Sequence, residues 1–331
     1  SFQLKKVGEE RIVRFLEEII DKSNILGSNE DAVAQEWDGS ILVANTDAIS
    51  WESDILPNMT PFQIGKKVVS ITVSDLAAKG AVPRIFMSSI NLPSTEKLNV
   101  LLGIVNGMKE AAHFYGMKYL GGDLGTASEG VIAGFAIGFL SKGQILRRDG
   151  AKEADYVCIT GKIGQTGVVI NQIYQNKPLS ALNPKWLNKL MEPTARAMEG
   201  RILSESGLVN ASIDSSDGLA KSLWELASQS QKRIIITDLP VDKSIVDYAT
   251  QNDLNLIDLV FYGGEEYELI CCVPSNSFQL LRQKIVTLGS GFEKIGYITK
   301  GKGEVYLEKE GELIKLQRKG WWDTFASPFD T

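Results

Sequence analysis

The chain has 331 residues, of which 44% are hydrophobic, 23% charged and 8% aromatic, as in ordinary soluble globular proteins. A single hydrophobic core rarely covers so long a chain, so we expect two domains. The net charge is −6 and no run of Lys and Arg is longer than two residues. Both observations argue against a nucleic-acid partner, because binding to a phosphate backbone needs a basic face.

The sequence has no feature of a membrane protein. No stretch approaches eighteen consecutive apolar residues, and residues 2–19 have the spacing of an amphipathic helix rather than of a signal peptide. The three cysteines lie in apolar, strand-like runs without metal-ligand spacing, where buried and inert thiols are expected. They are Cys158, Cys271 and Cys272. We therefore expect a cytoplasmic protein with no membrane partner.

The first half of the chain is expected to alternate strands and helices. Its strands are expected, from their β-branched and aromatic content, at residues 41–47, 84–92 and 131–140. Residues 68–81 are ambiguous, because their β-branched content favours a strand whereas their SDLAAKG end, with Gly80 as a possible stop, favours a helix. We expect a helix here because of the family resemblance described below. A long amphipathic helix is expected over residues 95–115, followed by a short strand and a turn at residues 121–123.

A polar and basic stretch at residues 143–150 marks the expected boundary between two domains, residues 1–148 and 149–331. The elements expected after it are a strand at 156–161, a helix from Gly167, a loop near Pro184, helices at 196–205 and 218–226, strands at 234–239 and 269–274, a helix at 278–288 and a β-ribbon at 295–309. The alternation lacks the strict period of a doubly wound parallel sheet. The fold class we expect is therefore α+β, in two domains.

Aspartates lie in five short strings at the ends of apolar runs: EDAV from Glu30, NTDA from Asn45, SDLAAKGA from Ser74, GGD from Gly121 and IDSSDGL from Ile213. Taken singly, each has an ordinary structural explanation, such as helix capping, a surface position or turn chemistry. If the fold brings these carboxylates together, they repel one another unless cations lie between them. The set therefore predicts a magnesium site.

Other sequence motifs, present or absent, limit the ways in which the protein can bind phosphates and catalyse a reaction. The sequence has no GxxxxGK[ST] string and no GxGxxG after a strand, so nucleotide phosphates would have to be bound through metal ions. Its single histidine, His113, falls late in the long helix and gives little support for a histidine base. Phosphoryl transfer to a phosphate acceptor needs no such base, because a phosphate monoester loses its second proton near pH ~6 and is then a competent nucleophile.

In their order along the chain, these strings resemble those of thiamine-monophosphate kinases, relatives of aminoimidazole-ribonucleotide synthetase, selenophosphate synthetase and the hydrogenase maturation protein HypE. The similarity runs nearly end to end and includes RRDGAKEADYVCITG, EPTAR, GGEEYEL, IGYIT and GWWDTF. It implies magnesium-dependent transfer of the γ-phosphoryl group of ATP, in line, to thiamine phosphate. It also implies a homodimer in which the N-terminal α/β domain forms a dimeric β-barrel, with an α+β C-terminal domain completing the site.

The resemblance implies a role for residues in each string. The implied magnesium ligands are Asp31, Asn45, Thr46, Asp47, Asp75, Asp123, Asp214 and Asp217. The implied ATP contacts are Gly122, Asp123, Arg148 and Ser216, with Arg148 and Asp217 as catalytic residues. The implied contacts to thiamine phosphate are Asp54, Glu265 and Trp322. The chemistry agrees, because a guanidinium suits phosphate oxygens and an indole ring suits a cationic heteroaromatic ring.

Four departures from the family pattern leave alternatives open. They are Asn29-Glu30-Asp31 in place of GDD, Leu124-Gly125 in place of two threonines, Glu266 in place of aspartate, and Asp54 in place of the common histidine. The Asp54 carboxylate could pair with the cationic thiazolium or could face the acceptor phosphate. The alternative functions are another ATP-using relative, purine synthetase-like or hydrogenase-maturation-like, and a non-catalytic ligand-binding homologue.

Overall fold

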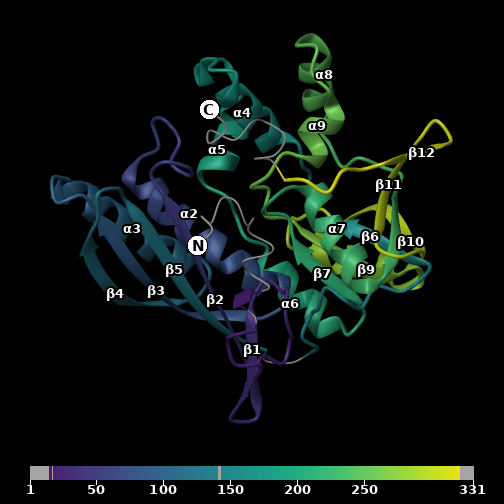
Figure 1. Ribbon diagram of the computed structural model, residues 1–331, viewed down its shortest axis with the longest axis horizontal. Helices are drawn as coiled ribbons and strands as arrows, with labels where there is room; N and C mark the ends of the chain where they lie inside the picture. The colour runs from purple at the N-terminus through teal and green to yellow at the C-terminus, as the bar shows by residue number, and fades with distance from the viewer. Residues whose placement is uncertain (1–14, 17, 141–142, 321–331) are drawn as a thin grey trace.

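The computed structural model describes residues 15–16, 18–140 and 143–320, which contain two β-sheets with packed helices (Figure 1). The first sheet has the strand order β1-β2-β5-β3-β4, in which β3 and β4 are parallel and the other neighbours antiparallel. The elements of this half are β1 (Val33–Trp37), β2 (Ser40–Ser50), α2 (Pro61–Ala78), β3 (Val82–Leu92), α3 (Leu98–Phe114), β4 (Lys118–Thr126) and β5 (Val131–Leu140). Strand β1 is an addition to the elements expected from the sequence.

Helix α2 contains the β-branched run and is buried on nearly every side. Thr60 and Gln63 form a capping box at its start, and Pro61 occupies its first turn. The helix packs on the sheet and against α3, so closely that a Cβ on Gly107 would lie 2.0 Å from the Phe62 carbonyl oxygen. Tertiary packing thus overrides the strand propensity of this segment, and the expected helix is confirmed.

The face of the first sheet opposite α2 is apolar and partly exposed. Strand register places Thr46 beside Phe135, and Phe135 beside Met87, on this outer face. Phe135 and Met87 are 37% and 39% exposed, and Val33 and Trp37 on β1 are 53% and 62% exposed. Contiguous exposure of large apolar side chains on a sheet is typical of an interaction surface.

The second half forms a sheet in the order β12-β11-β8-β10-β6-β9-β7. Its elements are β6 (Asp155–Ile159), α4 (Gln165–Tyr174), η2 (Leu179–Ala181), α5 (Pro184–Met191), α6 (Ala197–Ser206), β7 (Ala211–Asp214), α7 (Leu219–Ser230), β8 (Lys232–Ile236), α8 (Lys243–Gln251), α9 (Leu256–Phe261), β9 (Leu269–Pro274), η3 (Ser275–Ser277), α10 (Phe278–Val286), β10 (Glu293–Lys300), β11 (Glu304–Lys309) and β12 (Glu312–Lys315). The mixed α+β class is confirmed.

Several local expectations are wrong. Pro184 begins α5 instead of lying in a loop, because proline suits the first turn of a helix. The expected ribbon at 295–309 does not form, since β10 and β11 pair with opposite edges of β8, and β11 forms its hairpin with β12. The expected turn at 121–123 lies inside β4, where a Cβ on Gly122 would be 1.7 Å from the Ser88 carbonyl oxygen. Helices α8 and α9 were not expected.

The two halves contact each other mainly through α2, which packs against α6 and β7. A Cβ on Gly200 of α6 would lie 2.2 Å from the Ala77 carbonyl oxygen, so the two backbones touch. One hydrophobic cluster includes buried side chains from both sides of residue 148. Most of the amphipathic segment expected at residues 2–19 lies outside the described residues. Among the helices that are described, each is too short or too polar to cross a bilayer.

Candidate active site

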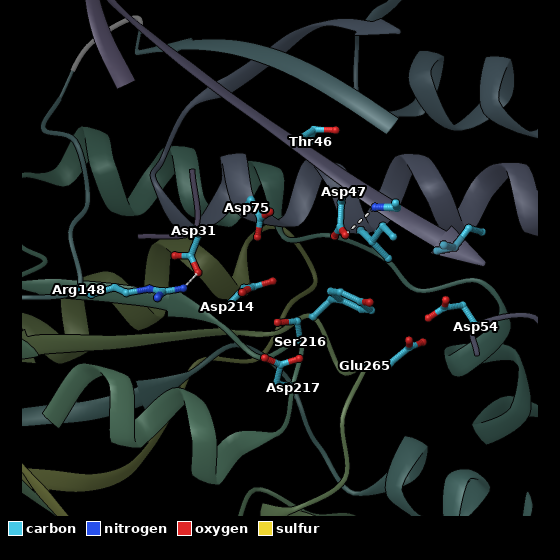
Figure 2. A pocket seen from close by; sticks show the side chains of 14 residues that line it. Asp31, Thr46, Asp47, Asp54, Asp75, Arg148, Asp214, Ser216, Asp217 and Glu265 are labelled. Carbon is cyan, nitrogen blue, oxygen red and sulfur yellow. Dashed lines mark hydrogen bonds and ion pairs between the residues drawn. The ribbon is translucent and has the colours of Figure 1, made fainter. Parts of the chain in front are cut away.

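A pocket of about 340 Å³ lies where the two halves meet. Its lining comprises Asp31, Thr46, Asp47, Ala48, Ile49, Asp54, Ile71, Asp75, Arg148, Asp214, Ser216, Asp217, Glu265 and Tyr267. Figure 2 shows the carboxylates of Asp31, Asp75 and Asp214 gathered at one end, and those of Asp54 and Glu265 at the other. The fold therefore converges carboxylates that are far apart in the sequence, as expected.

Three carboxylates form a compact cluster at the first end of the pocket. Asp31, Asp75 and Asp214 each offer one oxygen, and these oxygens lie within 4.8 Å of one another. They come from the loop before β1, from α2 and from the end of β7. Asp47 on β2 faces the same space (Figure 2). Oxygen ligands at this density are the type of site that Mg²⁺ and Ca²⁺ occupy.

Burial and mutual repulsion change the acidity of this cluster. Burial, followed by the charges of Asp214 and Asp31, raises the pKa of Asp75 well above its usual value. The pKa of Asp214 rises to about 7, first by burial and then by the charge of Asp31. The pKa of Asp47 rises to about 6, mainly by burial.

Asp31 is the exception in this cluster, because two cationic side chains lie beside it and offset its negative charge. Burial alone would raise its pKa, but the Arg148 guanidinium and the Lys79 ammonium, whose Nζ is 2.7 Å from Oδ2, lower it overall. Lys79 is fully buried at the end of α2 and also pairs with Glu30. A buried lysine between two carboxylates fixes the loop that carries Asp31. Residue type and spacing in the sequence do not mark Lys79 as a residue of the site.

The donor set fits a divalent cation. Asn45 is buried on β2, and its Nδ2 donates to Asp75 Oδ2 at 2.7 Å. This bond orients the amide, and its Oδ1 is buried with no hydrogen-bond partner among the described residues. Buried polar atoms without partners are costly, and a hard cation between Asn45 Oδ1 and the carboxylates would satisfy it. The residues of the cluster therefore suit Mg²⁺.

The other end of the pocket is built from two segments that contain residues implied by the family resemblance to contact the phosphate acceptor. We name them, on that expectation, the acceptor loop (residues 50–60) and the acceptor turn (residues 263–268). In the loop, Asp54 Oδ2 accepts hydrogen bonds from Ser50 N at 2.8 Å and from Ser53 Oγ at 2.6 Å. The Asp54 carboxylate thus closes its own loop while it lines the pocket. In the turn, Glu265 and Tyr267 line the pocket, and both have left-handed backbones with φ of 60° and 53°.

The acceptor turn is joined to the loop that carries Ser216 and Asp217. Glu265 N donates to Ser216 O at 2.6 Å, and Tyr267 N donates to Ser215 O at 2.9 Å. Asp217 is paired with Lys221 one turn further along α7, at 2.6 Å. These backbone bonds hold two parts of the pocket in one rigid arrangement: the end that contains the carboxylate cluster, called the metal end below, and the end that contains the acceptor loop and acceptor turn.

The structure does not bring every expected site residue into the pocket. Thr46 lines it with its backbone, but its Oγ1 donates to Gly134 O, and Figure 2 shows the side chain pointing away from the carboxylates. Gly122 and Asp123 lie on β4, which β5 and β3 separate from β2. Three strand spacings amount to about 14 Å. Trp322 lies outside the described residues.

Comparisons with known proteins agree with this geometry. Residues 29–140 match the family described as AIR synthase related protein, N-terminal domain. A thiamine-monophosphate kinase from Pyrococcus horikoshii is 33% identical over 320 residues, which cover 96% of each chain. The chain belongs to the thiamine-monophosphate kinase family.

Solved structures of this family share the fold. The structure of AaThiL complexed with AMPPCP and TMP superposes with a TM-score of 0.83, at 25% identity, over 97% of this chain and 98% of that one. Escherichia coli HypE, a hydrogenase maturation protein, has a TM-score of 0.70 at 20% identity, over 94% of this chain and 98% of that one. The likeness to HypE concerns the fold alone.

Proposed function

We propose that the protein transfers the γ-phosphoryl group of ATP to thiamine phosphate, forming ADP and thiamine diphosphate. The observation that carries the proposal is a single pocket with a cation-binding carboxylate cluster at one end and the acidic, aromatic acceptor segments at the other (Figure 2). Membership of the thiamine-monophosphate kinase family and the AaThiL complex with AMPPCP and TMP support the reaction and both substrates.

At the metal end, Asp31, Asp75, Asp214 and Asn45 Oδ1 would hold magnesium, together with Asp47 and Asp217. When bound, the ions neutralise the phosphate oxygens of the two substrates. Arg148 lies beside the cluster, and in the part of the chain that the structure describes its buried Nε has no hydrogen-bond partner. Its guanidinium therefore keeps one donor for a phosphate oxygen, and the Ser216 hydroxyl lies nearby (Figure 2). The acceptor phosphate, as a dianion, needs no protein base.

At the acceptor end, Glu265 and Tyr267 suit the cationic heteroaromatic part of thiamine phosphate. Trp322 is proposed to add a second aromatic contact. The described chain approaches this end shortly before that residue, since Lys319 Nζ lies 4.6 Å from the ring centroid of Tyr262, just ahead of the acceptor turn.

We also propose that residues 1–148 and 149–331 act as two domains, and that the exposed outer face of the first sheet pairs with a second copy into a dimeric β-barrel. The apolar side chains of that face support this assembly. Gly122 and Asp123 lie three strand positions away from β2 and are not among the residues that line the pocket of their own chain. Their proposed role therefore depends on the dimer bringing a second copy of β4 to the pocket.

The test is incubation of the protein with ATP, Mg²⁺ and thiamine phosphate, with parallel samples in excess EDTA. We expect equal amounts of ADP and thiamine diphosphate, and no product with EDTA. ADP without thiamine diphosphate would instead indicate another ATP-using reaction of the superfamily. Binding of nucleotide without any ADP would indicate a non-catalytic homologue.

A further inference from the structure

A buried lysine links the two acceptor segments. Lys67 on α2 is only 1% exposed. Its Nζ lies 2.6 Å from Glu265 Oε2 and also donates to the Asp54 carbonyl oxygen at 3.2 Å. One ammonium group therefore bonds the acceptor turn and the acceptor loop, which are about two hundred residues apart in the sequence. Burying an ammonium is costly unless it is paired and hydrogen-bonded, as this one is.

The position of Lys67 on α2 also relates it to the metal end. Lys67, Ile71 and Asp75 follow one another at intervals of four residues, so they share one face of the helix. Eight residues of helix span about 12 Å. A single rigid helix thus places a cation against the acceptor segments and a cluster carboxylate at the other end of the same pocket.

Glu265 needs external support to hold its position. Its backbone is left-handed, with φ of 60°, which is unfavourable for a residue other than glycine. Its carboxylate is buried, and burial raises its pKa even though Lys67 acts in the opposite direction. Without a cation beside it, a carboxylate in this place would turn outward or take up a proton. The Lys67 ammonium lowers the pKa of this carboxylate and holds it in place by pairing with it at the pocket wall.

We propose that Lys67 is a positioning residue for the phosphate acceptor: it acts through Glu265, holds the acceptor turn against the acceptor loop, and balances the negative charge at that end of the pocket. This inference rests on the proposed function for the identity of the acceptor. It concerns neither ATP nor magnesium, which bind at the other end.

Kinetics of three variants test the proposal. Lys67→Met should raise the KM for thiamine phosphate about tenfold while the KM for ATP changes less than about twofold. In the background of Glu265→Gln, the same substitution should have a smaller effect, because the carboxylate through which Lys67 acts is already neutral and only the bond to the Asp54 carbonyl oxygen remains to be lost. Lys66→Met is the matched control, since Lys66 is the adjacent lysine but pairs with Glu192, at 2.6 Å, outside the pocket lining.

Equal effects of Lys67→Met in both backgrounds would overturn the proposal, as would equal losses for both substrates. If Lys67→Met alone does not fold, the variant that also carries Glu265→Gln should fold, because it leaves no unpaired buried charge. Failure of both to fold would make Lys67 a part of the structural core only and would overturn the proposal.

Hydrogen exchange separates this inference from the proposed function, because it needs no substrate. In Lys67→Met, peptides covering residues 50–60 and 263–268 should exchange at least about threefold faster, while peptides from β3 should not change. That result supports the positioning role even if the wild-type protein makes no thiamine diphosphate, an outcome that would overturn the proposed function alone. Unchanged exchange in the two acceptor segments would overturn the role of Lys67.

Discussion

At the scale of single residues, charge compensation decides which acidic groups are available to a metal ion. Asp31 is neutralised by Lys79 and Arg148, whereas Asp75 accepts a hydrogen bond from a neutral amide, that of Asn45, and faces other carboxylates. Asp75 is therefore the member of the cluster whose negative charge is least compensated. A cation bound there would relieve the repulsion, which couples metal binding to the stability of the site.

Replacing Asp75 with Asn keeps the shape of the side chain and removes its charge. We expect magnesium-dependent binding of an ATP analogue to weaken at least about tenfold, because a ligand is lost, while the metal-free protein becomes more stable as the repulsion is relieved. Titration calorimetry and thermal unfolding measure the two effects. Asp149→Asn, which removes a surface carboxylate paired with Arg147, is the control. Unchanged metal-dependent binding would contradict the role of Asp75.

Asp54 combines a loop-closing role with a place in the pocket. Asn at this position keeps an oxygen for Ser50 N and Ser53 Oγ, whereas Ala keeps none. We therefore expect Asp54→Ala to raise the KM for thiamine phosphate more than Asp54→Asn, with the KM for ATP unchanged. Steady-state kinetics at high and low Mg²⁺ measures this. A lower KM for Asp54→Asn at low Mg²⁺ would instead place the carboxylate beside the acceptor phosphate.

At the scale of elements, α2 organises the site. It carries Lys67 and Asp75, ends directly before Lys79, and touches the first sheet, α3 and α6. Its position relative to α3 depends on glycines that let the two backbones approach. A shift of α2 would move both ends of the pocket at once.

Gly107→Ala tests this packing. In an open helix the change would stabilise by up to about 1 kcal/mol, but here the new Cβ would lie 2.0 Å from the Phe62 carbonyl oxygen. We expect a net loss of about 1–3 kcal/mol in the free energy of unfolding, because the helices must separate. Denaturant unfolding measures it, with Asn106→Ala on the exposed side of α3 as control. A stabilised Gly107→Ala variant would show that the α2–α3 contact is adaptable.

At the scale of the whole molecule, the metal-free protein should lose stability as the pH rises from about 4 to 7. Asp47 and Asp214, with folded pKa values of about 6 and 7 against 3.8 in the unfolded chain, bind more protons when folded in this range. The free energy of unfolding therefore decreases until both have lost their protons. Calorimetry in EDTA measures the slope, which Mg²⁺ or Asp214→Asn should reduce. A slope that is the same with and without Mg²⁺ would contradict this.

The proposed homodimer makes a second prediction at this scale. Light scattering of the wild type should give twice the 36.3 kDa mass of one chain. Phe135→Asp, on the outer face, should give monomers and lose activity, because Gly122 and Asp123 could then no longer reach a pocket. Leu98→Asp, at a more exposed apolar residue on α3, should stay dimeric. A wild-type monomer at micromolar concentration would refute the assembly.

The kind of chemistry expected at the site and most of the elements could be predicted from the amino-acid sequence. The aspartate strings and the absence of a P-loop pointed to metal-dependent phosphate binding, because residue type and local spacing are properties of short segments. The residues that favour a helix, such as the SDLAAKG end of residues 68–81, likewise lie within one short segment. The pairing of strands is not a local property. Strand β11 was expected in a ribbon with β10 but pairs with β8 and β12, because the partners of a strand depend on the whole sheet.

Which of the expected residues lie close together could not be predicted from the sequence and depends on the folding of the whole chain. The tertiary structure gathered Asp31, Asp75 and Asp214, turned the Thr46 hydroxyl to the outer face and left Asp123 on a distant strand. It also revealed Lys67 and Lys79, which in the sequence are ordinary charged residues of a helix. Whether a lysine is solvated or buried against a carboxylate depends on what packs around it, and that packing comes from segments far away along the chain.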